Sequence, residues 1–234
     1  MSSDEHAHSN LGRRELLHKA LVGTVAGIAT HAGIQFTSPN AIRAQTALSP
    51  TAALQTLLEG NTRFASNQLT SIEHDLIMLK QHTVHKQEPF AAVLSCADSR
   101  VPVELIFDQT IGHIFVTRIA GNIVAPEVIA SLEYGVVALG IKILLVLGHR
   151  NCGAVKAAMH ADAAPGQISA LYRHLQPAVE RSRGEFDAAI ETNALLQAEL
   201  LRTSSTVIRA ATQAGQVSVE AAVYDLATGK VRLM

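Results

Sequence analysis

Two short segments contain both cysteines of the chain, together with other residues that could do chemistry. Cys96 opens the run Cys-Ala-Asp-Ser-Arg, and Cys152 stands three positions after His149 in the run His-Arg-Asn-Cys-Gly. Thiolates and imidazoles are preferred ligands of Zn²⁺, and catalytic zinc sites have three protein ligands and leave the fourth position open. The sequence therefore predicts one Zn²⁺ per chain, held by Cys96, His149 and Cys152.

Charged and polar residues surround these candidate ligands. Asp98 and Arg100 lie two and four positions after Cys96, where a purely structural zinc site would not need them. A bidentate Arg–carboxylate pair would hold Asp98 off the metal, and breaking the pair would let Asp98 bind as a fourth ligand. We therefore predict that Asp98 and Arg100 are catalytic. We also expect the backbone N–H of Gly153 to donate to a thiolate sulfur, and Ser99 to be a local hydrogen-bonding residue.

Segments that alternate along the chain from Ser49 onward must position these residues. Apolar runs predict buried strands, and apolar residues at helical spacing predict helices. The predicted strands are 90–95, 114–119, 142–147, 217–224 and 230–233, and the predicted helices are 51–67, 76–85, 126–139, a helix from 151 onward, 167–183 and 186–214.

Nearly continuous apolar strands are typical of a parallel sheet covered on both faces. We therefore expect an α/β fold with a mostly parallel central sheet flanked by helices, an N-terminal helical arm and a C-terminal strand pair. Ligands of such sheets bind beyond the carboxyl ends of the strands. Because Cys96 and His149 each follow a predicted strand, we expect both at the same edge of the sheet.

The composition excludes some classes of partner. The 234 residues are 48 % hydrophobic and 17 % charged, with a net charge of −1. A nearly neutral protein has no electrostatic drive toward a phosphate backbone. The chain also has no Trp and few other aromatic residues on which bases could stack. We therefore expect no nucleic-acid partner.

The first part of the chain, residues 1–47, differs from the predicted catalytic domain over 48–234. The pair Arg13-Arg14 precedes a mildly apolar run over residues 20–32, and this arrangement resembles a bacterial twin-arginine export signal. The run is too short, and too rich in small residues, to form a stable membrane span. We expect a periplasmic protein, with a cytoplasmic protein that has a disordered or amphipathic arm as the alternative.

Export would normally favour a disulfide between two cysteines. The metal-ligand spacing of His149 and Cys152, and the charged residues near Cys96, favour zinc instead. Twin-arginine export carries folded proteins, so zinc could be bound in the reducing cytoplasm and would then protect both thiolates from oxidation.

Taken together, these motifs resemble those of the β-class carbonic anhydrases, from about Leu54 to the C-terminus. The resemblance rests on the Cys96–Arg100 and Gly148–Gly153 segments and on three further runs. These are Pro-Val-Glu-Leu-Ile-Phe-Asp-Gln over 102–109, Arg-Ile-Ala-Gly-Asn over 118–122, and Ala-Ser-Leu-Glu-Tyr over 130–134.

The resemblance implies a zinc lyase (carbonate dehydratase) that reversibly hydrates CO₂ to bicarbonate and a proton through zinc-bound hydroxide. It implies the same three ligands and the same Asp–Arg pair, and a homodimer or homotetramer with the substrate cleft at a dimer interface. Gln87 matches a bicarbonate-binding Gln of the family, while Phe115 and Tyr134 match residues that keep the CO₂ site apolar. Plain core packing is the alternative for these two aromatic residues.

One position departs from part of the family. Members with an inhibitory bicarbonate site carry a Trp three residues before the first ligand, where this chain has Val93. The departure implies an enzyme without that regulatory site, in which Asp98 rests paired with Arg100.

Other functions share parts of this pattern. Some members of the family hydrolyse CS₂ or COS with the same ligands, so the motifs alone do not separate these substrates from CO₂. A non-catalytic zinc protein is a further alternative, and the Asp98–Arg100 pair argues against it.

Overall fold

The computed structural model describes residues 46–71, 83–160 and 164–234. The chain divides into two units, Met1–Ala41 and Ile42–Met234. All described residues belong to the second unit. None of the helices within the described ranges is both long and apolar enough to cross a membrane.

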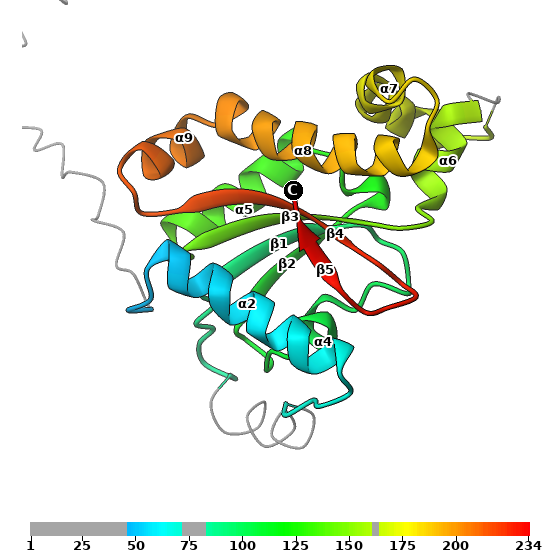
Figure 1. Cartoon of the computed structure of the whole chain (residues 1–234). Helices are drawn as coiled ribbons and strands as arrows, with labels where there is room; N and C mark the ends of the chain where they lie inside the picture. Colours follow the sequence, from blue (N-terminus) through cyan, green and yellow to red (C-terminus); the bar gives the residue numbers. More distant parts are fainter. Residues whose placement is uncertain (1–45, 72–82, 161–163) are drawn as a thin grey trace, which may run out of the picture. The chain divides into compact units, whose positions relative to one another are not determined.

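A five-stranded sheet forms the centre of the second unit, in the order β2-β1-β3-β4-β5 (Figure 1). Neighbouring strands are parallel except for β4 and β5, which pair antiparallel. The strands are β1 (Ala91–Ser95), β2 (Ile114–Arg118), β3 (Ile143–His149), β4 (Ser218–Tyr224) and β5 (Val231–Leu233). This arrangement confirms the predicted α/β fold with its C-terminal strand pair.

Helices cover both faces of the sheet. Figure 1 shows α2 and α4 against one face and α8 and α9 on the other. The helices are α2 (Pro50–Ala65), α4 (Val103–Ile106), α5 (Pro126–Val137), α6 (Gly153–His160), α7 (Tyr172–Arg181), α8 (Phe186–Ser204) and α9 (Thr206–Gln213), with 3₁₀ turns η1 (Ala120–Asn122) and η2 (Ile168–Leu171).

The two central strands, β1 and β3, are almost wholly apolar because both of their faces are buried. In β1, Ala92 and Leu94 pack into the core beneath α5 to α9, while Ala91 and Val93 pack into the core beneath α2 and α4. Side chains alternate between the two faces of a strand, so each strand serves two cores. Burial on both faces explains why nearly continuous apolar runs in the sequence predicted the parallel sheet.

Two of the predicted helices were wrong in extent. The segment 186–214 is two helices, because Ser205 has extended backbone angles and its Oγ accepts a hydrogen bond from the N–H of Ile208, at 3.0 Å. A serine in this role begins a new helix. The segment 167–183 contains the 3₁₀ turn η2 followed by the shorter α7.

Two other helices differ from the prediction in other ways. Most of the predicted helix over 76–85 lies outside the described residues, and its described part, 83–85, forms bends. The four-residue helix α4 was not predicted, because a single turn is too short to show helical periodicity.

Candidate metal centre

Three buried residues from neighbouring elements form the candidate metal centre. Cys96 directly follows β1, His149 is the last residue of the adjacent strand β3, and Cys152 directly precedes α6. Their ligand atoms all lie within 4.8 Å of one another. The parallel pairing of β1 with β3 brings the ends of both strands to one edge of the sheet, as the sequence predicted. Both cysteines are free.

The imidazole of His149 is oriented for a metal. Its Nδ1 donates to the carbonyl oxygen of Arg150 at 2.9 Å, because a carbonyl can only accept. The proton therefore lies on Nδ1, and Nε2 keeps a free lone pair. Nε2 is buried and has no hydrogen-bond partner among the described residues. Such an orphaned nitrogen beside two sulfur atoms fits a Zn²⁺ ion, whose ligands are commonly His and Cys.

The environment of the two sulfur atoms favours one thiolate even without metal. The pKa of Cys96 is lowered by a hydrogen bond with Cys152, and further by the side chain of His149 and the N–H of Gly121, against the effect of burial. The pKa of Cys152 is raised by the same hydrogen bond with Cys96 and by burial. The pair therefore shares one proton, which a bound cation would displace.

Asp98 forms the bidentate pair with Arg100 that the sequence suggested. Arg100 Nε donates to Oδ1 at 2.9 Å and Nη2 donates to Oδ2 at 2.7 Å, and the backbone N–H of Arg100 also donates to Oδ1. These hydrogen bonds lower the pKa of Asp98. Asp98 Oδ2 lies 3.8 Å from the free Nε2 of His149. The carboxylate is thus ionised, oriented by Arg100 and adjacent to the metal ligands.

Arg118 anchors the loop that carries these groups, a role that sequence reasoning missed. Its Nε donates to the carbonyl oxygen of Cys96 at 3.1 Å, and its Nη2 donates to the carbonyl oxygen of Asp98. Arg118 ends β2 and pairs in register with Ser95 of β1. The sequence signal for this role is a charged residue at the end of a predicted strand, where the neighbouring strand ends at the first ligand.

The backbone of two turns supplies hydrogen bonds to the sulfur atoms. Gly121 N–H donates to Cys96 Sγ at 3.3 Å, and the N–H groups of Val155 and Ala154 act to lower the pKa of Cys152. Gly153 begins α6, one and two residues before these donors, and its own contribution stays a prediction. Ser99 is exposed in the turn after Asp98 and makes no side-chain hydrogen bond with the described residues.

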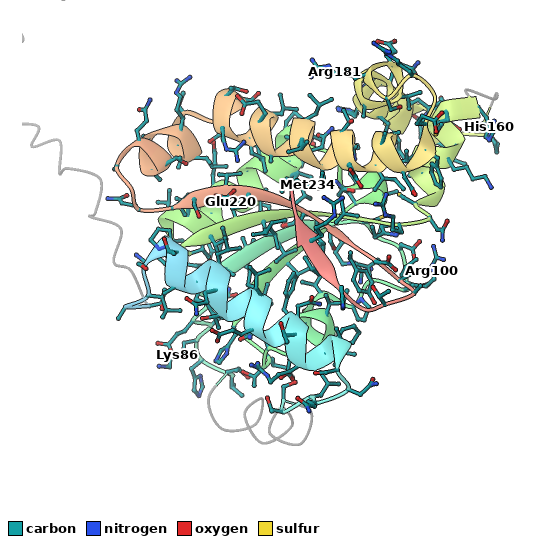
Figure 2. The ribbon with its side chains drawn as sticks, viewed as in Figure 1. Lys86, Arg100, His160, Arg181, Glu220 and Met234 are labelled. Atoms are coloured by element: carbon teal, nitrogen blue, oxygen red, sulfur yellow. The ribbon has the colours of Figure 1, made fainter. Side chains whose placement is uncertain are left out.

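The three predicted substrate residues gather elsewhere. Gln87 and Tyr134 line one cavity of about 540 Å³, and the Phe115 and Tyr134 rings are 6.2 Å apart. No zinc ligand lines this cavity. Phe115 pairs with Ala92, four residues before Cys96, which places it roughly 13 Å from that ligand along the strand at about 3.3 Å per residue. Figure 2 likewise shows Lys86, which lines the cavity, well apart from Arg100.

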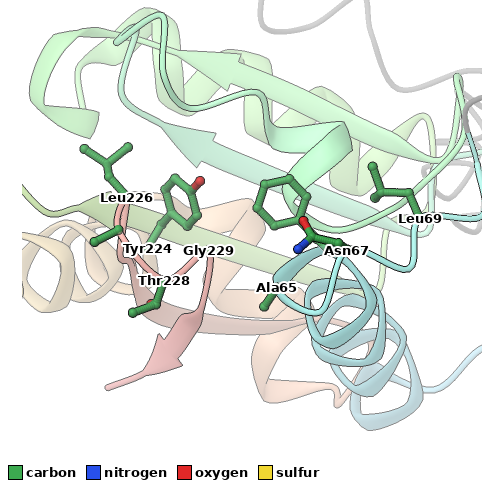
Figure 3. A pocket seen from close by; sticks show the side chains of 9 residues that line it. Ala65, Asn67, Leu69, Tyr224, Leu226, Thr228 and Gly229 are labelled. Atoms are coloured by element: carbon green, nitrogen blue, oxygen red, sulfur yellow. The ribbon is translucent and has the colours of Figure 1, made fainter.

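A second cavity of about 340 Å³ lies between the end of α2 and the β4–β5 hairpin. Figure 3 shows Tyr224 and Leu226 on one side of it and Asn67 and Leu69 on the other. Tyr224 pairs in register with His149, yet none of the three metal ligands lines this cavity.

Comparisons with known proteins agree with this site. The sequence profile of the carbonic anhydrase family matches residues 91–231. A carbonic anhydrase of Mycolicibacterium smegmatis is 33 % identical over 196 residues, which cover 79 % of this chain and 93 % of that protein.

Two solved structures have a similar fold. The β-carbonic anhydrase of Coccomyxa in complex with acetazolamide is 29 % identical, with a TM-score of 0.60 over 77 % of this chain and 86 % of that chain. One of two tetrameric β-carbonic anhydrases from the ascomycete Sordaria macrospora is 23 % identical, with a TM-score of 0.61 over 77 % of this chain and 96 % of that chain. The family profile spans more than half of the chain, and the M. smegmatis enzyme is matched along nearly all of its length. This chain therefore belongs to the carbonic anhydrase family, in its β class.

Proposed function

We propose that this protein is a zinc-dependent carbonic anhydrase that interconverts CO₂ with bicarbonate and a proton, with one Zn²⁺ per chain. The observation that carries the proposal is the Asp98 carboxylate beside the Cys96–His149–Cys152 group, held in place by two hydrogen bonds from the side chain of Arg100 and one from its backbone N–H. A structural zinc site uses four protein ligands, whereas this group has three and a restrained carboxylate next to them.

The chain's own residues divide the work of the reaction. A bound zinc ion supplies Lewis acidity and lowers the pKa of a coordinated water. His149 and the two cysteines would hold the ion, and the Nδ1–H bond to Arg150 fixes the ring. Because Asp98 is ionised and held by Arg100, its carboxylate would accept a hydrogen bond from the attacking water and orient a lone pair of that water toward CO₂. Arg100 keeps Asp98 from becoming a fourth ligand.

The substrate side of the site is supplied by a second copy of the chain. In one chain Gln87, Phe115 and Tyr134 form a cluster apart from the ligands, and Tyr134 is 52 % exposed. The β-class resemblance implies a cleft at a dimer interface, and the Sordaria relatives are tetrameric. In a homodimer or homotetramer, the partner's apolar rings would hold CO₂ and its glutamine would donate to bicarbonate.

Substrate choice is tested by kinetics on the purified, zinc-loaded protein. Stopped-flow assays should show hydration of CO₂, its loss on chelation and its return with one equivalent of zinc. Hydrolysis of CS₂ or COS by a zinc-loaded protein that leaves CO₂ unchanged would replace this function with the alternative. Absence of turnover with all three substrates, with zinc bound, would leave a non-catalytic zinc protein.

Bicarbonate is expected to act on this enzyme only as product. Val93 is fully buried in the core beneath α2 and α4, at the position where family members with an inhibitory site have Trp. Initial rates of CO₂ hydration should therefore show hyperbolic product inhibition by added bicarbonate. A sigmoidal loss of activity would indicate a regulatory site.

We also propose that residues 1–47 direct export by the twin-arginine route and that 48–234 are the catalytic domain in the periplasm. The support is the Arg13-Arg14 pair ahead of the short apolar run. In a bacterial host with this pathway, the double variant Arg13→Lys, Arg14→Lys should remain in the cytoplasm. Unchanged periplasmic recovery of the variant would favour the cytoplasmic alternative.

A further inference from the structure

Two amide side chains lie on the buried face of α8, where the helix packs against the sheet. Asn193 is 1 % exposed and Gln197 is 3 % exposed. They share this face with apolar residues at helical spacing, namely Ile190, Ala194, Ala198 and Leu201. Burying an amide costs free energy unless its polar atoms are hydrogen-bonded. The partners of these two side chains therefore indicate what they do.

Two of their four hydrogen bonds lead to one turn, one joins the two amides, and one leads to α7. Asn193 Nδ2 donates to the carbonyl oxygen of Gly121 at 2.9 Å. Gln197 Oε1 accepts from the N–H of Val124 at 2.7 Å, and Gln197 Nε2 donates to Asn193 Oδ1 at 3.0 Å and to the carbonyl oxygen of His174 at 3.2 Å. The two amides thus hold both ends of the segment 121–124 and also hold each other.

This turn reaches the metal centre through its backbone. The N–H of Gly121 donates to Cys96 Sγ at 3.3 Å. Gly121 has a φ of +74°, in the left-handed region that favours glycine. A Cβ at this position would meet Leu175 at 3.1 Å and Ala154 at 3.4 Å. The direction of the N–H···S hydrogen bond therefore depends on an unusual backbone conformation in a tightly packed place.

We propose that Asn193 and Gln197 are positioning residues that fix the Gly121 N–H on Cys96 Sγ and thereby limit the electron donation of this thiolate to the bound metal. A hydrogen bond to a ligand sulfur withdraws charge from it, so the metal stays more electrophilic. This inference rests on the proposed function and deepens it. It assigns the tuning of the metal centre to side chains on a helix that supplies none of its ligands.

The test uses Co²⁺ in place of Zn²⁺, because thiolate-to-cobalt charge-transfer bands report the energy of the sulfur lone pairs. Asn193→Ala removes the bond to Gly121, and Gln197→Met removes the second anchor with little change in side-chain volume. Both variants should shift the band to longer wavelength, with the larger shift for Asn193→Ala. Zinc affinity, measured by chelator competition, should fall about 10-fold or more, because the turn no longer holds Cys96 in place and this loss outweighs the stronger donation of the freed thiolate.

Leu201→Ala is the matched control. It creates a cavity on the same face of α8 without touching the hydrogen bonds, so it should lower stability and leave the band in place. Equal band positions in the wild type and both amide variants would overturn the inference, even if the variants are less stable. A shifted band in a protein that does not hydrate CO₂ would support the inference and contradict the proposed function.

Discussion

The hydrogen bonds around single atoms set the chemistry of this site. Arg100 donates to both oxygens of Asp98, Arg150 accepts from His149 Nδ1, and Gly121 donates to Cys96 Sγ. The bonds from Arg100 orient the carboxylate of Asp98, and the bond from His149 Nδ1 leaves the lone pair on Nε2 free. The bond from Gly121 draws charge from the sulfur of Cys96. The chemistry of the centre thus depends on backbone groups as much as on the ligands themselves.

The backbone conformation of Gly121 predicts the effect of a substitution at this residue on stability. Replacing it by Ala should lower the free energy of unfolding by about 1–3 kcal/mol, because an L side chain is strained at positive φ and the new Cβ crowds Leu175. Urea unfolding of the zinc-loaded protein measures this. Gly135→Ala is the control, because its Cβ would meet only ordinary contacts, at 3.5 Å or more. Equal losses in both variants would contradict the special role of the turn.

The residues predicted from the sequence at this scale are those whose side chains carry the chemistry. Cys96, His149 and Cys152 were found because metal ligands need particular residue types, and Asp98 and Arg100 because charges stand beside a ligand. Gly121 acts through its backbone N–H, which every residue except proline has. No residue type marks such a donor, so only the structure shows it.

Among the helices and loops, the buried carboxylate of Asp108, just after α4, binds both α2 and the residues that follow α2. Asp108 accepts from Arg63 Nε at 2.6 Å, and from the backbone N–H and hydroxyl groups of Thr70 and Ser71. Its side chain is fully buried. Burial opposes ionisation, but the hydrogen bonds from Arg63, Thr70 and Ser71 outweigh it and lower the pKa of Asp108 to about 2 from 3.8.

This carboxylate gives a pH prediction. A pKa lower in the folded state than in the unfolded state means that the stabilisation is present above about pH 4 and is lost as the pH falls toward 2. The shift corresponds to about 2 kcal/mol. Asp108→Asn should remove this part of the pH dependence of unfolding. The control Asp187→Asn, at a carboxylate that is 69 % exposed, should keep the pH dependence of the wild type. If the free energy of unfolding of Asp108→Asn changes with pH as steeply as that of the wild type, the assignment is contradicted.

The sequence predicted the sheet better than the helix ends, for a physical reason. Continuous apolar runs such as 143–147 favour a parallel strand that is covered on both faces. The break at Ser205 depends on a hydrogen bond from its hydroxyl to the backbone, and serine is also tolerated within helices. The sequence did not show that Asn193 and Gln197 of α8 are buried, because polar residues are usually exposed. Their burial depends on hydrogen-bond partners across the core.

For the whole molecule, we propose that more than one chain builds each site, because Gln87, Phe115 and Tyr134 lie apart from the metal ligands within one chain. Gln87 and Tyr134 share a cavity that no ligand lines, and Phe115 lies near the opposite end of β2 from Arg118. Closed symmetric assemblies bring the same surface of two copies together. A twofold partner could therefore complete each metal centre with its own cluster.

Mixing two defective variants tests this. Asp98→Ala removes the carboxylate and Gln87→Ala the amide, so each homodimer is impaired at both sites. After dissociation and reassembly of an equal mixture, half of the dimers are hybrids that contain one chain of each variant. If Asp98 and Gln87 of one site come from different chains, one of the two sites in each hybrid has both groups intact. Activity should rise to about a quarter of the wild-type value. Activity that stays at the mean of the two variants would place both groups in one chain.

We propose that the Asp98 carboxylate beside the three-ligand zinc site serves CO₂ hydration. The most direct measurement is the stopped-flow kcat for CO₂ in wild type and Asp98→Ala, with zinc content determined on the same samples. We expect one zinc per chain in both proteins and a loss of kcat of about 100-fold or more in the variant, within the range of general acid–base contributions. Full activity of Asp98→Ala with zinc retained would contradict it.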